Sequence, residues 1–208
     1  MSEPLALFSL ALAAGGGWVD GVEAQQWLAA GHAMLSRSAP LVRALASRRA
    51  AILLPPSGAF FTALAACDGR GAVLINPLAS RPEIARQLLD ANVGAVFTNL
   101  ELSPRLPAGT AFALLDEAPR SALVVVGGVI RTVDLGHHWG LALAGRTDTE
   151  GRDEEAVIVY TSAMAGRPLG AILTHKNLLA NALASGDALG DTVDDHCLAT
   201  LPFAHLFG

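Results

Sequence analysis

The segment with the clearest chemical potential is residues 160–170, which read Tyr-Thr-Ser-Ala-Met-Ala-Gly-Arg-Pro-Leu-Gly. It follows an apolar run typical of a strand and combines two hydroxyls, two glycines and a proline. Such a loop can wrap a phosphate group, with backbone N–H groups and the hydroxyls of Thr161 and Ser162 as donors. Its glycine spacing matches neither the Walker loop nor the dinucleotide-binding fingerprint, so an ordinary turn is the alternative.

Other groups of polar residues indicate chemistry less clearly. His137 and His138, followed by Trp139, could belong to a metal site, but adjacent histidines point in different directions, so we interpret them as part of a loop or strand. Four aspartates could bind a cation, and the alternative is a solvated helix end and loop; they are Asp187, Asp191, Asp194 and Asp195. We therefore predict no metal site and assign no catalytic residue.

Taken with two further segments, the loop resembles that of the adenylate-forming enzymes, which include acyl-CoA synthetases, luciferases and peptide-synthetase adenylation domains. That family carries Tyr-Thr-Ser-Gly-Thr-Thr-Gly-x-Pro-Lys-Gly, followed by a helix that typically begins Leu-Thr-His-x-Asn-Leu. Residues 173–178 of this chain read Leu-Thr-His-Lys-Asn-Leu in register, and Asn181 follows. Residues 201–208 read Leu-Pro-Phe-Ala-His-Leu-Phe-Gly and resemble the family motif Leu-Pro-x-aromatic-His-x-x-Gly. The resemblance runs from about residue 50 to residue 208.

The resemblance implies which residues contact the substrates. In the family this loop holds the triphosphate tail of ATP, which assigns nucleotide contacts to Thr161, Ser162, Gly166, Arg167, Pro168 and Gly170. His205 matches the histidine that helps to shape the acid site, and a histidine that caps a strand end is the alternative. ATP and Mg²⁺ are the cofactors of the full-length family, and a carboxylic acid and coenzyme A are its substrates.

The loop also departs from the family pattern. Ala163, Met164 and Ala165 stand where the family has Gly-Thr-Thr, and Leu169 stands where it has lysine. A charge-assisted hydrogen bond contributes about 1.5–3 kcal/mol and a neutral one about 1 kcal/mol. The loss of one cation and two hydroxyls therefore predicts weak phosphate binding. Ala204, in place of the usual aromatic residue, favours a longer acyl chain as substrate.

Two functional hypotheses follow from the resemblance. The first is the N-terminal fragment of an ATP-dependent acyl-CoA ligase, which forms an acyl-adenylate and then a thioester from a fatty or other apolar acid. The alternative is a catalytically degenerate homologue that acts as a binding or interaction module. Later family motifs are missing, so we interpret residues 1–208 as the N-terminal part of the large domain, with a possible boundary near 146–155. We expect this chain to be inactive alone and to self-associate.

The elements that must position these motifs are short apolar runs that alternate with helical patterns. Continuous apolar runs indicate strands covered on both faces, at residues 50–54, 72–75, 95–98, 111–115, 123–126, 156–160 and 197–201. Helices are predicted at 57–67, 82–91 and 175–189. Ser80 and Glu83 form a capping box, Thr174 is an N-cap, and Ile84, Leu88 and Leu89 are the expected buried stripe. This alternation predicts an α/β domain with a mostly parallel sheet and helices on both faces.

Composition limits the remaining possibilities. Of 208 residues, 52% are hydrophobic, which is too many for a disordered chain, and the net charge is −5 without a basic stretch. Nucleic acid and anionic membranes are therefore unsuitable partners. Residues 4–14 are apolar but lack a basic n-region and are too short to span a bilayer, so we predict a first helix and a cytoplasmic protein. Cys67 and Cys197 are expected to be buried thiols.

Overall fold

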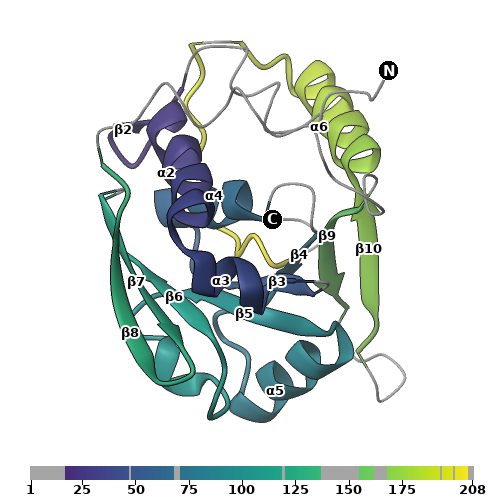
Figure 1. Ribbon diagram of the computed structural model, residues 1–208. Helices are drawn as coiled ribbons and strands as arrows, with labels where there is room; N and C mark the ends of the chain where they lie inside the picture. The colour runs from purple at the N-terminus through teal and green to yellow at the C-terminus, as the bar shows by residue number, and fades with distance from the viewer. Residues whose placement is uncertain are drawn as a thin grey trace, which may run out of the picture.

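The computed structural model describes residues 17–46, 48–67, 71–118, 120–136, 155–161, 168–192, 194–198 and 200–205. Their main feature is an eight-stranded sheet with the order β10-β9-β4-β3-β5-β6-β7-β8 (Figure 1). The strands are β3 (Arg49–Leu53), β4 (Ala72–Leu74), β5 (Val93–Thr98), β6 (Phe112–Leu115), β7 (Ser121–Val126), β8 (Val129–Asp134), β9 (Glu155–Tyr160) and β10 (Gly170–Thr174). The helices are α2 (Ala24–Arg37), α3 (Ala39–Ala44), α4 (Gly58–Ala66), α5 (Arg81–Asp90) and α6 (His175–Leu189). A small hairpin of β1 (Trp18–Val19) and β2 (Val22–Glu23) precedes α2.

The centre of the sheet is parallel and its edges are antiparallel. The five strands from β9 to β6 run parallel to one another, and helices α4 and α5 connect β3 to β4 and β4 to β5. β10 is antiparallel to β9 at one edge, and β7 and β8 form an antiparallel hairpin at the other. The predicted α/β fold with a mostly parallel sheet is confirmed.

The central strands of the sheet are buried on both faces because helices cover both. Along β3, Ala50 and Ile52 belong to the larger apolar core with α2, α3 and α4, whereas Ala51 and Leu53 belong to a second core with α5. This alternation follows from the two-residue period of a strand. Figure 1 shows α5 on the opposite side of the sheet from α2, α3 and α4. A strand covered on both faces has no polar side, which explains its continuous apolar sequence.

Helices α2 and α4 approach each other closely. A Cβ atom at Gly58 would overlap the indole ring of Trp27, and one at Gly31 would overlap the backbone carbonyl oxygen of Thr62. The Thr62 hydroxyl donates to the carbonyl oxygen of Trp27 at 2.9 Å. Glycine at these two positions therefore sets the position of α4 relative to α2.

The three predicted helices are confirmed to within a residue or two. The Glu83 carboxylate accepts from the backbone N–H of Ser80 at 2.8 Å, as the capping box requires. The expected buried stripe of α5 is wrong at one position, because Leu89 is 83% exposed. The buried positions are Ile84, Gln87 and Leu88, whose spacing of three and four residues defines the face that meets the sheet, and Leu89 lies beside that face.

The strand predicted at residues 197–201 is wrong. Cys197, Leu198, Thr200 and Leu201 have no strand conformation, and Leu198 is 85% exposed. An apolar run becomes a strand only where a neighbouring strand pairs with it, and no strand in the described part of the chain does so here. The prediction of a buried thiol is accordingly wrong for Cys197, which is exposed, and is confirmed for Cys67.

Several predictions fall outside the described residues. These are the first helix at 4–14, the histidine pair at 137–138 with Trp139, the polar stretch 146–154, and three loop residues, Ser162, Gly166 and Arg167. Among the described helices, none combines the length and apolar character that crossing a bilayer requires.

Candidate functional site

The neck of the loop at residues 161–169 is closed by two hydrogen bonds. The backbone N–H of Thr161 donates to the carbonyl oxygen of Leu169 at 2.9 Å, and the N–H of Leu169 donates to the Thr161 hydroxyl oxygen at 3.3 Å. The neck continues the antiparallel pairing of β9 and β10, in which Tyr160 lies opposite Gly170. The Thr161 hydroxyl keeps its own hydrogen available to donate to a ligand.

Tyr160 ties the end of β9 to helix α5. Its hydroxyl donates to the Asp90 carboxylate at 2.8 Å. A Cβ atom at Gly170 would lie 3.4 Å from Cζ of the Tyr160 ring and 3.0 Å from Cγ2 of Ile158. The lack of a side chain at Gly170 therefore leaves room for the Tyr160 ring on the neighbouring strand. Partial burial, together with the hydrogen bond to the Asp90 carboxylate, raises the pKa of Tyr160 well above its ordinary value.

The other end of β9 is fixed by an ion pair. The Glu155 carboxylate accepts from Nε of Arg49 at 2.6 Å and from Nη2 at 3.0 Å, and both side chains are largely buried. Arg49 also donates to the carbonyl oxygen of Ala91, at the end of α5. The hydrogen bond to Glu155 raises the pKa of the Arg49 guanidinium. Strand β9 is therefore anchored at both ends before the loop begins.

An apolar cavity of about 450 Å³ lies against β9. Its walls come from α4, β4, β9, β10, α6 and the segment around residue 203, with the lining residues Phe60, Phe61, Leu64, Leu74, Ala156, Val157, Val159, Leu173, Asn177, Leu178, Asn181, Phe203 and His205. Phe203 packs edge-on against Phe60 and Phe61, with ring centroids 4.9 and 5.8 Å apart. The volume falls in the range of small-molecule sites, which are mostly apolar with few polar groups.

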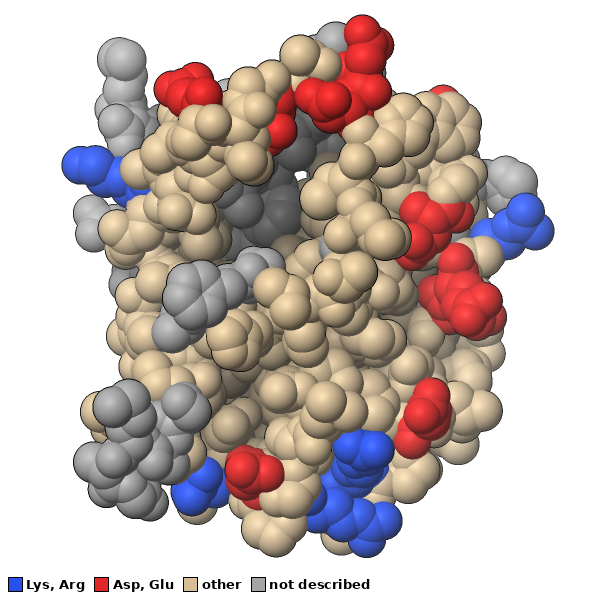
Figure 2. All heavy atoms as spheres, turned by 180° about the vertical axis from the view of Figure 1, so that it is seen from behind, with Lys and Arg blue, Asp and Glu red and all other residues tan. Residues whose placement is uncertain are grey.

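Three polar side chains line this cavity. Asn177 and Asn181 come from the first turns of α6, and His205 comes from the C-terminal segment. Asn177 is held in place because its side-chain oxygen accepts from the N–H of Thr174 at 3.1 Å, while its own N–H donates to the Thr174 hydroxyl at 3.1 Å. Seen from behind, the molecule is hollowed in its upper half, with uncharged atoms at the sides of the hollow and acidic residues along its upper rim (Figure 2). This arrangement suits an apolar ligand with one polar end.

The structure describes four of the predicted site residues. His205 lines the cavity, Thr161 stands at the neck of the loop, and Pro168 follows the loop just before β10. Gly170 lies within β10 beside Tyr160. Ala204 is buried in the core and does not line the cavity. Sequence reasoning missed Phe60 and Phe61, although adjacent aromatic residues early in a predicted helix were visible.

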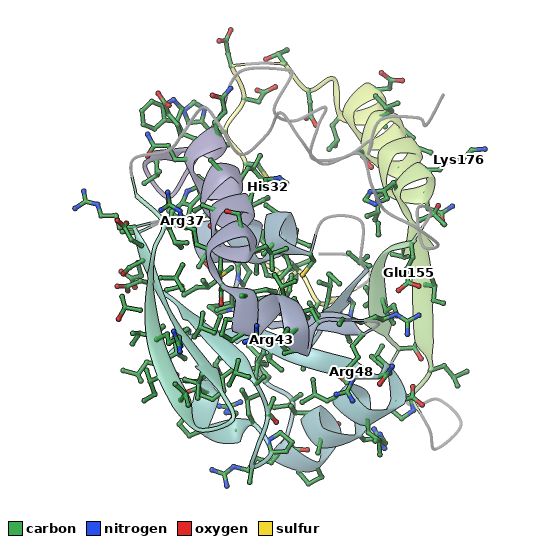
Figure 3. All side chains as sticks on the ribbon, in the orientation of Figure 1. His32, Arg37, Arg43, Arg48, Glu155 and Lys176 are labelled. Carbon is green, nitrogen blue, oxygen red and sulfur yellow. The ribbon has the colours of Figure 1, made fainter. Side chains whose placement is uncertain are left out.

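The described aspartates of the C-terminal part do not gather into a metal site. No cluster of histidine, cysteine or acidic residues in the described part of the chain could hold a metal ion. Asp195 instead accepts from the backbone N–H of Thr192, and Asp187, Asp191 and Asp194 are exposed, as expected for a solvated helix end and loop. The single lysine, Lys176, points outward from α6, away from the body of the molecule (Figure 3).

Comparisons with known proteins agree on one family. A 2-succinylbenzoate–CoA ligase of Bacillus cytotoxicus is 31% identical over 140 residues, which cover 67% of this chain and 25% of the relative. The peroxisomal OPC-8:0-CoA ligase 1 of Arabidopsis thaliana is 29% identical over 166 residues, which cover 76% of this chain and 29% of the relative. The solved o-succinylbenzoate–CoA synthetase of Bacillus subtilis, in complex with ATP and magnesium, matches with a TM-score of 0.57 and 26% identity, covering 88% of this chain and 43% of that one.

The chain spans about a quarter to a third of the length of these curated relatives. The family model described as AMP-binding enzyme matches residues 42–208, which include the hairpin β9–β10, helix α6 and the cavity. The chain therefore belongs to the AMP-binding family of adenylate-forming enzymes.

Proposed function

We propose that this chain is the N-terminal part of the large domain of a ligase that joins a carboxylic acid to coenzyme A at the expense of ATP. The carboxylate attacks the α-phosphate of ATP and displaces pyrophosphate, which gives an acyl-adenylate. The thiol of coenzyme A then takes the acyl group, and AMP leaves. The relatives named as CoA ligases support this reaction. We propose that the 208 residues are inactive alone, and the cytoplasm remains our expectation for their location.

The observation that carries this proposal is the continuity of cavity and loop. Val157 and Val159 of β9 line the cavity, and two residues later Thr161 forms the neck of the loop. An acid whose apolar part fills the cavity would place its carboxylate near His205 and the start of the loop. The nucleotide contacts that we propose are Thr161, Ser162, Gly166, Arg167, Pro168 and Gly170, with ATP supplying the adenylyl group that activates the acid.

The fit to ATP is incomplete, and among the described residues Leu169 shows this most directly. Leu169, which replaces the family lysine, is 66% exposed and offers no charge to a phosphate. Lys176 points outward from α6 and does not take its place (Figure 3). We therefore propose that these residues bind the phosphates weakly.

The cavity supports a fatty or other apolar acid as the substrate. Three phenylalanines and several aliphatic side chains form its walls, and no Lys, Arg, Asp or Glu is among the described residues that line it. Burial of apolar surface contributes about 25 cal/mol per Å², so an alkyl or aryl acid gains most from this space. The small size of Ala204 does not contribute to it, because Ala204 is buried elsewhere in the core.

Calorimetric titration with decanoate tests this assignment. Leu178→Trp places an indole in the cavity from α6, whereas Leu183→Trp adds the same side chain at a position that is 62% exposed and does not line the cavity. We expect decanoate binding in the unaltered chain and in Leu183→Trp, and at least a tenfold loss in Leu178→Trp. Equal affinity in the two variants would place the acid elsewhere.

The alternative function, an interaction module, is favoured by one observation. The side chain of Leu169, which replaces the family lysine, is apolar and exposed, and Ile172 in the following strand β10 is 55% exposed. Apolar residues on a surface strand are typical of contacts with another polypeptide.

A further inference from the structure

Strand β10 has an unpaired edge in the described part of the chain. It pairs with β9 on one side and is the last strand of the sheet order. The backbone of Leu169 bonds to Thr161, and the backbone groups of successive residues in a strand point to opposite edges. The N–H and C=O groups of Ala171 and Leu173, two and four residues later, are therefore directed toward β9. The groups of Gly170 and Ile172 therefore point to the open edge.

This edge lacks the features that usually protect an exposed strand. No ionisable side chain occurs from Pro168 to Thr174, and the one irregularity in the pairing with β9 lies at its end, between Leu173 and Thr174. The opposite edge, β8, carries the charged residues Arg131 and Asp134. Charges and irregularities on edge strands prevent pairing with other chains, so β10 is the edge that remains open to it.

Helix α6 extends this surface. Between Asn177 and Gly186 it carries no charged residue, yet Leu183 is 62% exposed and Leu189 is 77% exposed. Isolated helices of 15 residues are marginal in water and gain stability by packing an apolar face. Strand and helix follow each other along one side of the molecule (Figure 1), and we call them together the β10–α6 surface, whose charged residues are Lys176 and Asp187.

We propose that two copies of this chain associate through the β10–α6 surface, with their β10 strands paired antiparallel about a two-fold axis. An open strand edge pairs with another extended segment, and β10 of a second copy supplies such a segment with its own unpaired edge when two strands run antiparallel about a two-fold axis. The chain has a net charge of −5, but this surface is uncharged apart from Lys176 and Asp187 on α6, so two copies meet here without strong repulsion.

The pairing places specific residues together. With Ile172 at the centre, the two Ile172 residues exchange N–H···O=C bonds, since both groups point to the open edge. The antiparallel arrangement puts Leu169 of one copy beside the start of α6 of the other. Leu169 and Leu173 lie on one face of the strand, and Leu173 lines the cavity below α6, so Leu169 would face the helix of the second copy. The proposal gives a role to the leucine that replaces the family lysine, and it does not depend on the proposed ligase function.

Sedimentation equilibrium of the 208-residue chain tests the proposal with two matched variants. Ile172→Lys introduces a charge on β10, and Ile130→Lys introduces the same charge on the opposite edge, where Ile130 is 68% exposed. We expect the unaltered chain and Ile130→Lys to form a dimer of twice 21.4 kDa at micromolar concentration, and Ile172→Lys to dissociate at least tenfold more readily. Circular dichroism confirms that each variant is folded.

Amide hydrogen exchange provides the second measurement. The amides of Gly170 and Ile172 should exchange more slowly as the protein concentration rises, whereas those of Ala171 and Leu173, already bonded to β9, should not change. A monomer at all concentrations would overturn the proposal. Dissociation caused by Ile130→Lys, or growth into open-ended assemblies, would also overturn it, because either would place the contact outside a two-fold β10 pair.

Discussion

Thr161 and Leu169 hold each other across the neck of the loop, through an N–H···O=C bond of 2.9 Å in one direction and an N–H···Oγ1 bond of 3.3 Å in the other. These bonds use the backbone of Leu169 and not its side chain. A different side chain at position 169 therefore leaves both hydrogen bonds of the neck in place. This separation explains how the hairpin persists although the family lysine is gone.

The first prediction concerns Tyr160, the single tyrosine of the chain. Partial burial and the hydrogen bond to Asp90 raise its pKa, so its phenol should ionise well above the ordinary value of about 10. A spectrophotometric titration of phenolate absorbance reports this residue without interference from others. In denaturant the midpoint should return to about 10. A folded-state midpoint at the denatured value would contradict the observed environment.

The same shift predicts a loss of stability in alkali. A folded-state pKa above the unfolded one means that the folded protein holds its proton more tightly, so this stabilisation is present below about pH 10 and is lost as the pH rises toward the folded-state value. Tyr160→Phe should remove this dependence and cost about 1 kcal/mol at neutral pH through the lost hydrogen bond. Urea unfolding at pH 7 and pH 10.5 or so measures both effects. If Tyr160→Phe loses as much unfolding free energy in alkali as the unaltered chain, a group other than Tyr160 causes the loss.

The second prediction compares two adjacent arginines. Arg49→Gln should lower the free energy of unfolding by about 2–3 kcal/mol, because it leaves the largely buried Glu155 carboxylate without its charged partner. Arg48→Gln should change it by less than about 0.5 kcal/mol, since Arg48 is exposed. Denaturant unfolding of the two variants decides the point, and equal effects would show that the ion pair does not anchor β9.

The third prediction compares two helical glycines. Gly58→Ala should destabilise the protein by about 2–4 kcal/mol, because its Cβ would overlap the Trp27 ring and force α2 away from α4. Gly186→Ala in α6 should instead stabilise it by about 0.5–1 kcal/mol, since its nearest neighbour would lie 3.9 Å away and alanine favours helix. Thermal unfolding measures both. A neutral Gly58→Ala would mean that the two helices can separate at little cost.

Much of the fold could be predicted because local signals agreed with tertiary structure. The central strands are covered on both faces, so their sequences are continuously apolar, and caps such as Ser80 with Glu83 and Thr174 with Asn177 mark helix starts directly. The errors concern residues whose state depends on distant partners. Leu89 and Leu198 are as apolar as buried leucines, and only the absence of a covering element in the described structure leaves them exposed.

The site was predictable only in part. The loop and His205 were visible as motifs, whereas the cavity was not, because it brings together α4, β9, α6 and the segment at residue 203, which are distant in sequence. Strands β8 and β10 and helices α2 and α3 were also missed. β8 is exposed along most of its length, with only Val133 buried, and therefore lacks the continuous apolar run that identified the predicted strands.

The central claim is that this hairpin is a nucleotide loop weakened by substitution, and calorimetric titration with ATP tests it most directly. The unaltered chain should bind ATP with a dissociation constant in the millimolar range or weaker, equivalent to about −4 kcal/mol. Combining Ala163→Gly, Met164→Thr, Ala165→Thr and Leu169→Lys should tighten binding at least tenfold, because a cation and two hydroxyls are restored while the neck at Thr161 is unchanged. Micromolar binding by the unaltered chain, or no gain in the restored one, would contradict the account.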